Sequence, residues 1–329
     1  MTSILYLCDG LSIHDRNFIE SLSSVTSIEV LDIREICFSN PTEEILTRNP
    51  KMIIVTPIGA LIDYVPENFS GALIGISLAF DLNEIHTEAA RNIAIFRLNR
   101  LSGAIVDSEH TKRKLIQDFG YQGDVLKIVY GLRNPPVYGC RRLDYKLNRL
   151  LVTRTWTPLH NNELILETFL NVPPKYELSV AFLEPPEVYG QMSETRKLLL
   201  ESAGVEFLKP MSNNDLQVSL LNYGVYVSAS KSDGTSISLL EAMHAESICL
   251  VSDFPSNEEI ITNEQNGFLF HNGSKESLLE SIIKIQTLTL REARSIGSRA
   301  KLRVGELANW EQHSKALVEF CLSFEGKPK

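Results

Sequence analysis

The sequence lacks the short motifs that mark several large enzyme classes. It contains no G-x-x-x-x-G-K-[ST] phosphate loop, no G-x-G-x-x-G dinucleotide loop and no H-E-x-x-H zinc motif. It also lacks the G-x-S-x-G nucleophile elbow of serine hydrolases. Interpretations as a kinase, a dehydrogenase, a zinc hydrolase or a serine hydrolase therefore lose their main support.

Cysteine is scarce and scattered. The chain has five cysteines, which is an odd number, and no two of them form a C-x-x-C pair. A structural zinc site or a disulfide framework needs paired, regularly spaced cysteines, so neither is expected. The pattern fits a reducing compartment.

Long apolar runs are also missing. The longest apolar stretch, Ala72–Phe80, is far shorter than the roughly 20 residues that a membrane-spanning helix needs. Met1–Asp9 has no basic segment leading into an apolar one, so no signal peptide is expected. We expect a cytoplasmic protein. Peripheral contact with the inner face of the membrane stays open, because a local basic or apolar patch suffices for it.

Positive charge is in deficit, with a net charge of -9. Binding to a nucleic acid backbone needs a basic surface, so nucleic acid is not an expected partner. One basic cluster stands out, formed by Arg141, Arg142, Lys146 and Arg149. It is interpreted either as a solvated linker or as a local basic patch.

The chain does contain a regular alternation of apolar runs and amphipathic segments. Several runs are continuously apolar, as strands buried on both faces of a parallel sheet are. The predicted strands are 3–8, 27–33, 51–56, 72–78, 104–107, 125–129, 149–153, 177–182, 205–208, 225–228, 248–252 and 267–270. Helices are predicted between them, among others over 15–22, 109–119, 161–170, 193–203, 213–222, 236–244 and 294–304. This alternation predicts α/β domains built on doubly wound parallel sheets.

The 329 residues suit two domains. Gly131–Asn148 contains two successive prolines, which neither continue a helix nor pair in a central strand, and this indicates an interdomain linker. The predicted division is an N-terminal domain over 1–146, a C-terminal domain over 147–308, and a helix over 309–329 that packs back toward the first domain. Trp310 is predicted to anchor a core.

The segment Ser228–Met243 is the most informative stretch for chemistry. A strand ends near Ser228, a polar loop with one glycine follows, and a helix begins near Thr235 or Ser236, both good N-cap residues. The amides of a first helical turn form a site for anions. Asp233 precedes the helix, and Glu241 lies inside it, where a carboxylate can accept hydrogen bonds from a diol such as a ribose.

This segment resembles the donor-binding signature of glycosyltransferase family 4, whose members are retaining enzymes with the GT-B fold. In that family an acidic residue, seven intervening residues and a glutamate precede an Ala-Met pair. The corresponding residues here are Asp233, Glu241 and Ala242-Met243. The similarity extends over roughly 150–324, through Arg154–His160, Val251–Asp253, Ser256–Ile260, Asn266–Phe270 and Asn309–Glu311. It is looser in the first half, at Asp9-Gly10 and Ser108–Lys112.

The resemblance implies a GT-B architecture of two Rossmann-like domains that face each other across a cleft, with the donor on the second domain. It implies that Glu241 binds the nucleotide ribose and that Asp233 faces the donor sugar. The backbone of Gly234, Thr235, Ser236 and Ile237 would hold the sugar and the diphosphate. Gly10, after the opening strand, is a further expected donor contact.

Arg154 is expected to neutralise the diphosphate, because a guanidinium donates two parallel, charge-assisted bonds. His160 would be its partner in this role. Stabilisation of the departing nucleoside diphosphate is then the main catalytic contribution. No Asp-x-Asp metal-binding pair is evident, so neither a metal nor another cofactor is expected.

The implied reaction is transfer of a sugar from a nucleotide-sugar, UDP- or GDP-linked, to a glycan, a lipid-linked or a small-molecule acceptor. The resemblance also points to polysaccharide biosynthesis. Two alternatives remain: an inactive, glycosyltransferase-like binding subunit and a nucleotide-sugar epimerase. The sequence gives no oligomeric state.

The sequence departs from the family pattern at several positions. Asp233 stands where the family often has Glu, His160 stands near the position of a usual Lys, and Glu246 replaces a Gly that would cap the helix. A bound diphosphate should favour the protonated form of His160. The family's histidine of the first domain has no clear counterpart, and His14 and Asp81 are the candidates, either as substrate contacts or as structural groups.

Overall fold

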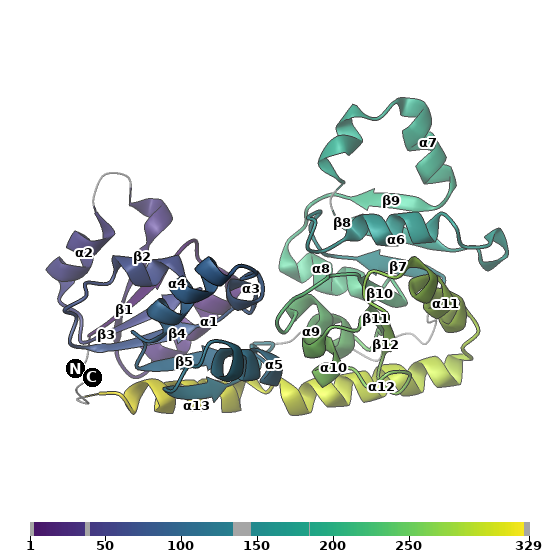
Figure 1. Cartoon of the computed structure of the whole chain (residues 1–329). Helices are drawn as coiled ribbons and strands as arrows, with labels where there is room; N and C mark the ends of the chain where they lie inside the picture. The colour runs from purple at the N-terminus through teal and green to yellow at the C-terminus, as the bar shows by residue number, and fades with distance from the viewer. Residues whose placement is uncertain (1–2, 37–39, 134–145, 184, 326–329) are drawn as a thin grey trace. The chain divides into compact units, whose positions relative to one another are not determined.

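The computed structural model describes residues 3–36, 40–133, 146–183 and 185–325. The described residues form two compact units, one made of those up to residue 133 together with those from residue 309 onward, and the other of those from residue 146 to residue 308. Most of the predicted linker, including the stretch just before the predicted boundary at residue 146, lies outside the described residues. Each unit is a parallel six-stranded sheet covered by helices, so the predicted α/β class is confirmed (Figure 1).

The first sheet has the strand order β2-β1-β3-β4-β5-β6. Its strands are β1 (Ser3–Cys8), β2 (Ser27–Asp32), β3 (Met52–Thr56), β4 (Ala72–Ile76), β5 (Gly103–Val106) and β6 (Asp124–Lys127). The helices of this unit are α1 (Ile13–Ser23), α2 (Pro41–Arg48), α3 (Phe80–Asn83), α4 (Glu88–Leu98), α5 (Glu109–Arg113) and α13 (Trp310–Leu322).

Alternate residues of β1 enter different cores. Leu5 and Leu7 belong to a cluster on one face of the sheet. Ile4, Tyr6 and Cys8 belong to a cluster on the other face. Apolar side chains are therefore needed at every position, which explains the continuous apolar run in the sequence.

The second of these clusters includes α13. Trp310, Leu317 and Cys321 are buried there, together with Phe18 of α1. The ring of Trp310 lies 5.8 Å from that of Phe18. His313 of α13 contacts the Val129 carbonyl oxygen through Nδ1 at 2.8 Å. The C-terminal helix is thus part of the core of the first unit.

The second sheet has the strand order β12-β11-β10-β7-β8-β9. Its strands are β7 (Arg149–Val152), β8 (Ser179–Leu183), β9 (Val205–Leu208), β10 (Val225–Ser228), β11 (Ile248–Ser252) and β12 (Phe268–Phe270). The helices are α6 (Asn162–Phe169), α7 (Glu194–Ser202), α8 (Asn213–Leu220), α9 (Ile237–His244), α10 (Pro255–Ile260), α11 (Lys275–Gln286) and α12 (Leu290–Leu307). This is the strand order of a Rossmann sheet.

The departure at Glu246 has a local structural explanation. Glu246 has a φ of +58°, in the left-handed region. The Glu246 amide donates to the Met243 carbonyl, and the Ser247 amide donates to the Ala242 carbonyl. These two bonds are the Schellman arrangement that ends a helix, and its left-handed position favours glycine.

The described cysteines carry no disulfide. Cys8, Cys249 and Cys321 are buried, and none of the three is part of a disulfide. The reducing compartment stays a prediction.

Candidate functional site

The candidate site lies where the second sheet changes its winding direction. β7 and β10 are parallel neighbours, with Val225 opposite Leu150. The chain adds β8 and β9 on one side of this pair and β11 and β12 on the other. Ligands of open α/β sheets bind beyond the carboxyl ends of strands at such a switch point. The loops after β7 and β10 carry most of the predicted site residues.

Hydrogen bonds fix these two loops to each other. The Lys231 amide of the loop after β10 donates to the Leu159 carbonyl of the loop after β7 at 2.9 Å. The side-chain amide of Asn162 donates to the Arg154 carbonyl at 2.7 Å. The Ser252 hydroxyl donates to the Ser230 carbonyl. The backbone around the site is therefore held in place by the fold.

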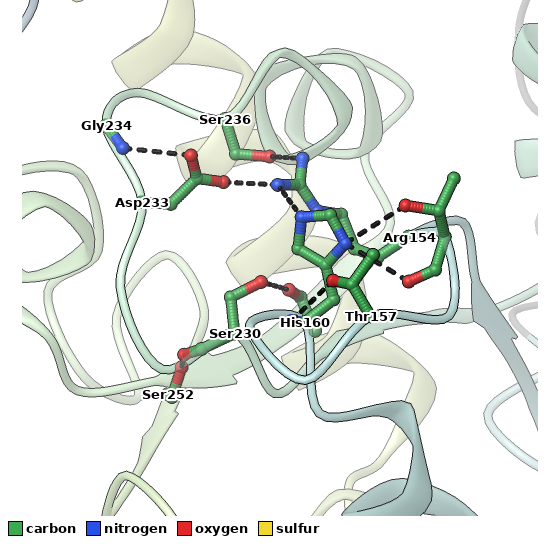
Figure 2. Close-up of polar contacts among 10 residues, drawn as sticks. Arg154, Thr157, His160, Ser230, Asp233, Gly234, Ser236 and Ser252 are labelled. Carbon is green, nitrogen blue, oxygen red and sulfur yellow. Dashed lines mark hydrogen bonds and ion pairs between the residues drawn. The ribbon is translucent and has the colours of Figure 1, made fainter. Parts of the chain in front are cut away.

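Arg154 is the centre of the site. Its Nη2 lies 2.6 Å from Asp233 Oδ2 and 2.7 Å from His160 Nε2, and its Nη1 lies 3.4 Å from Ser236 Oγ (Figure 2). The side chains of Arg154 and Asp233 are 18% and 22% exposed. The pair is thus largely shielded from water, which strengthens its electrostatics, yet it keeps access to solvent.

His160 is a hydrogen-bond acceptor in this arrangement. A guanidinium only donates, so Nε2 of His160 must carry the lone pair that faces Arg154. Nδ1 then bears the proton and donates to the Thr155 carbonyl at 3.1 Å. Burial and the neighbouring Arg154 lower the pKa of His160, which keeps the ring neutral at pH 7. Its protonation by a bound diphosphate stays a prediction.

The start of α9 faces the same group of residues. Ser236 is the N-cap, as predicted, but its side chain makes no capping hydrogen bond to the first turn. Its hydroxyl instead accepts from Arg154. The Ser236 hydroxyl therefore does not occupy the first-turn amides of α9, and an anion that binds there does not have to displace it. The guanidinium and the positive end of the helix are brought to one place.

Glu241 is held apart from the Arg154 cluster, in the second turn of α9. It is 4% exposed, and its Oε1 accepts from Nε2 of Gln217, on α8, at 3.0 Å. A helix rises about 1.5 Å per residue, so Glu241 lies roughly 6 Å along the axis from the start of α9. The sequence does not identify Gln217 as a site residue, because no local motif includes it and its contact with Glu241 depends on how α8 packs against α9.

The remaining predicted residues fall into two groups. Gly234, Thr235 and Ser236 are buried in the loop before α9, and Ile237 is half-buried at its start. Gly10 belongs to the first unit, where its amide donates to Asp32 Oδ1 at 2.9 Å. Its φ is +84°, and a Cβ there would lie 2.6 Å from the Arg34 guanidinium, so the turn itself requires glycine. A role of Gly10 in donor binding stays a prediction.

The two candidates of the first domain are integrated into its structure. Asp81 accepts hydrogen bonds from the Ile58 and Leu78 amides and from the Ser77 hydroxyl. The ring of His14 packs 5.3 Å from that of Tyr130. Both side chains thus have structural contacts, and a contact of either with the substrate stays a prediction.

Two features are missing from the described residues. They contain no group of three or more His, Cys, Asp or Glu side chains arranged to hold a metal ion. Within the same residues, every helix is too short or too polar to cross a membrane.

Residues 177–303 match the family model described as Glycosyl transferases group 1. The matched stretch runs from the residues before β8 into α12 and contains Asp233 and Glu241. Arg154 and His160 lie upstream of it. The chain is also 32% identical over 121 residues to glycosyltransferase 1 domain-containing protein 1 of Xenopus tropicalis. That match covers 36% of this chain and 33% of the frog protein, so the aligned part is about a third of either.

Solved structures resemble the chain over nearly its whole length. The Anabaena protein HepE in complex with UDP-glucose superposes with a TM-score of 0.79, covering 98% of this chain and 100% of that one at 13% identity. Sucrose-phosphate synthase from Thermosynechococcus elongatus gives a TM-score of 0.76, covering 97% of this chain and 98% of that one at 15% identity. The chain therefore has the GT-B fold, and its second unit carries a segment of the glycosyl transferases group 1 type.

Proposed function

We propose that this protein is a glycosyltransferase that uses a nucleoside diphosphate sugar as donor. The observation that carries the proposal is the position of Arg154 beside the start of α9, at the switch point of the second sheet. A guanidinium and a helix N-terminus together favour a diphosphate over a neutral ligand. The match over residues 177–303 supports the same reaction.

The proposed step breaks the bond between the anomeric carbon of the sugar and the β-phosphate oxygen. An acceptor hydroxyl forms the new bond to that carbon, and its proton passes to the departing phosphate. Negative charge grows on the diphosphate as the bond breaks, and Arg154 and the amides of α9 stabilise it. Departure and attack on the same face of the sugar give retention, as the resemblance to family 4 implies.

Donor binding requires a change at Arg154. Its Nη2 is engaged by Asp233 and His160, so a diphosphate competes with the Asp233 carboxylate for the same cation. Release of Asp233 then leaves this carboxylate free to accept from hydroxyls of the donor sugar. Glu241, held by Gln217, binds the ribose diol.

A uridine donor is the first one to test. HepE was solved in complex with UDP-glucose, and this chain shares its fold. The acceptor is proposed to be a glycan, a lipid-linked or a small molecule, and the reaction is proposed to proceed without a metal. Transfer should then persist unchanged in excess EDTA.

The experiment is thermal stabilisation by UDP, GDP, ADP, TDP and their sugars, because a ligand that binds only the folded protein raises the melting temperature. The test variant is Arg154→Ala. The control variant is Arg196→Ala on α7, which also loses one arginine but at an exposed position. We expect one nucleotide to stabilise the wild type and the Arg196 variant but not the Arg154 variant. In a transfer assay with that donor, Arg154→Ala should lower kcat by roughly 10²–10³-fold.

Stabilisation that survives Arg154→Ala would show that the diphosphate binds elsewhere. Stabilisation without transfer to any acceptor would favour a binding subunit. Interconversion of the nucleotide sugar without an acceptor would favour an epimerase.

A further inference from the structure

A cavity lies in the first unit, and none of its lining residues belongs to the group of Arg154, His160, Asp233 and Ser236. It has a volume of about 390 Å³ and lies at the carboxyl edge of the first sheet. The loop after β3, the short helix α3 and one side of α4 enclose it. Its walls are formed mainly by Ile58, Leu82, Ile85, Ile93, Ala94 and Leu98.

The two charged side chains at this cavity, Asp81 and Arg97, already have partners. Asp81 Oδ2 accepts from the Ile58 and Leu78 amides at 3.0 and 3.2 Å, and its Oδ1 accepts from the Ser77 hydroxyl at 2.7 Å. Arg97 Nε donates to Asp63 Oδ1 at 2.9 Å. A ligand entering the cavity would therefore meet mostly carbon. Burial raises the pKa of Asp81 to about 7, in keeping with a poorly hydrated wall.

Large apolar side chains at the cavity face solvent. Phe80 is 45% exposed and Ile93 is 51% exposed, and both line the cavity. Phe96, one turn along α4 from Ile93, is 61% exposed. Apolar surface gathered at a hollow is typical of a ligand site, since a bound apolar group would remove it from water.

We infer that this cavity binds a hydrocarbon chain, the apolar part of the acceptor. The lining favours an apolar occupant over a sugar, because a sugar needs polar partners for its hydroxyls and most of the lining side chains are apolar. The hollow shape favours an inserted chain over contact with a flat surface. That this hydrocarbon chain belongs to the acceptor rests on the proposed function, whereas binding of the hydrocarbon chain does not.

The test measures binding of n-decyl β-D-glucoside below its micelle concentration, by displacement of the fluorescent probe N-phenyl-1-naphthylamine. Methyl β-D-glucoside is the control ligand without a chain. Ile93→Glu places a charge at the exposed wall, and Ala94→Phe fills the cavity from a buried wall position. Leu302→Glu, on α12 with 68% exposure, is the matched control for a charge on an exposed apolar site.

We expect the decyl but not the methyl glucoside to bind. Ile93→Glu and Ala94→Phe should each weaken that binding at least tenfold, and Leu302→Glu should leave it within twofold of the wild type. The Ile93 variant keeps the test valid if Ala94→Phe does not fold. No binding of the decyl glucoside, or equal binding by Ile93→Glu and the wild type, would overturn the inference.

Nucleotide stabilisation, measured on the same variants, separates this inference from the proposed function. Stabilisation by UDP without binding of the decyl glucoside would overturn the hydrocarbon site and would still support the proposed glycosyltransferase. Alkyl binding that is sensitive to Ile93→Glu, without stabilisation by any nucleotide, supports the site and counts against the donor.

Discussion

One guanidinium nitrogen, Nη2 of Arg154, contacts both an imidazole and a carboxylate. Asp233 compensates its charge, and His160 is held neutral as an acceptor. A bound diphosphate would replace the carboxylate and add negative charge next to the imidazole. The protonation of His160 and the binding of the donor are therefore expected to be linked.

This linkage gives a prediction for pH. The pKa of His160 is lowered in the ligand-free protein and should rise when the diphosphate binds, so binding takes up a proton. A group whose pKa is higher in the complex makes binding tighter at low pH. The affinity for UDP-glucose should increase as the pH falls from 8 to 6, by up to about tenfold.

Titration calorimetry at several pH values would measure the effect. UDP-glucose is preferred to UDP because its diphosphate diester keeps a constant charge over this range. His160→Gln retains an acceptor for Arg154 but has no proton to gain. If the affinity for UDP-glucose changes with pH equally in the wild type and in His160→Gln, His160 is excluded as the source of the pH dependence.

Gln217 is the second residue that calls for a test. Its side-chain amide donates to Oε1 of Glu241 and so fixes the orientation in which the carboxylate would bind a ribose diol. Gln217→Leu should weaken UDP binding roughly fivefold, since a bond to a charged group is worth about 1.5–3 kcal/mol and only part of it concerns orientation. Binding of 2′-deoxy-UDP should change less.

The measurement is the ratio of the dissociation constants of 2′-deoxy-UDP and UDP. Val218→Ala, at an exposed neighbouring position on α8, is the control for the helix itself. An unchanged ratio in Gln217→Leu would mean that the bond has only a structural role.

Among the elements, the strands were predicted most accurately. All twelve described strands lie within two residues of the predicted ones, because strands buried on both faces leave a continuous apolar run. The helices are harder to predict from the sequence. α4 has only Ala94 and Leu98 buried, and its other positions carry no clear apolar stripe. α3 is a single turn, too short for any periodicity.

The candidate site was predicted in part, for a similar reason. The loops after β7 and β10 could be placed at one edge, because parallel strands end together. Contacts between side chains of different elements could not be derived from spacing. The bonds from Arg154 to Asp233 and from Gln217 to Glu241 are such contacts.

The end of α9 offers a prediction on stability. Glu246 adopts the left-handed conformation, which costs about 1–2 kcal/mol for a residue with a Cβ. Its carboxylate recovers some of this through Lys301 Nζ at 2.9 Å, a partly exposed pair worth up to about 1 kcal/mol. Glu246→Gly should therefore be at least as stable as the wild type.

Glu246→Ala is the matched variant, because it loses the same ion pair but keeps the Cβ. Its free energy of unfolding in urea should lie about 1 kcal/mol below that of Glu246→Gly. Equal stability of the two variants would show that the left-handed backbone is not strained.

At the scale of the whole molecule, the described chain has separate cores in its two units. Leu317 of α13 is fully buried in the first unit, although α13 comes after the second unit in the sequence. Leu317→Ala should destabilise the first unit by about 2–5 kcal/mol. A donor nucleotide should stabilise the second unit.

Differential scanning calorimetry should then resolve two transitions. Leu317→Ala is expected to lower the temperature of one of them, and UDP is expected to raise that of the other. A single transition that responds to both would show that the two units unfold together, and the assignment of their stabilities to separate cores would be wrong.

The contribution of α13 to the first unit also bears on biosynthesis. A ribosome makes residues 1–133 before the second unit, and it makes α13, which covers one face of the first sheet together with α1, only after that unit. Until Trp310 and Leu317 are translated, the part of that face that α13 buries has no cover, while the second unit has all of its strands and can fold. The nascent first unit therefore has to wait with apolar surface exposed, and this is the period in which a chaperone would be of most use to it.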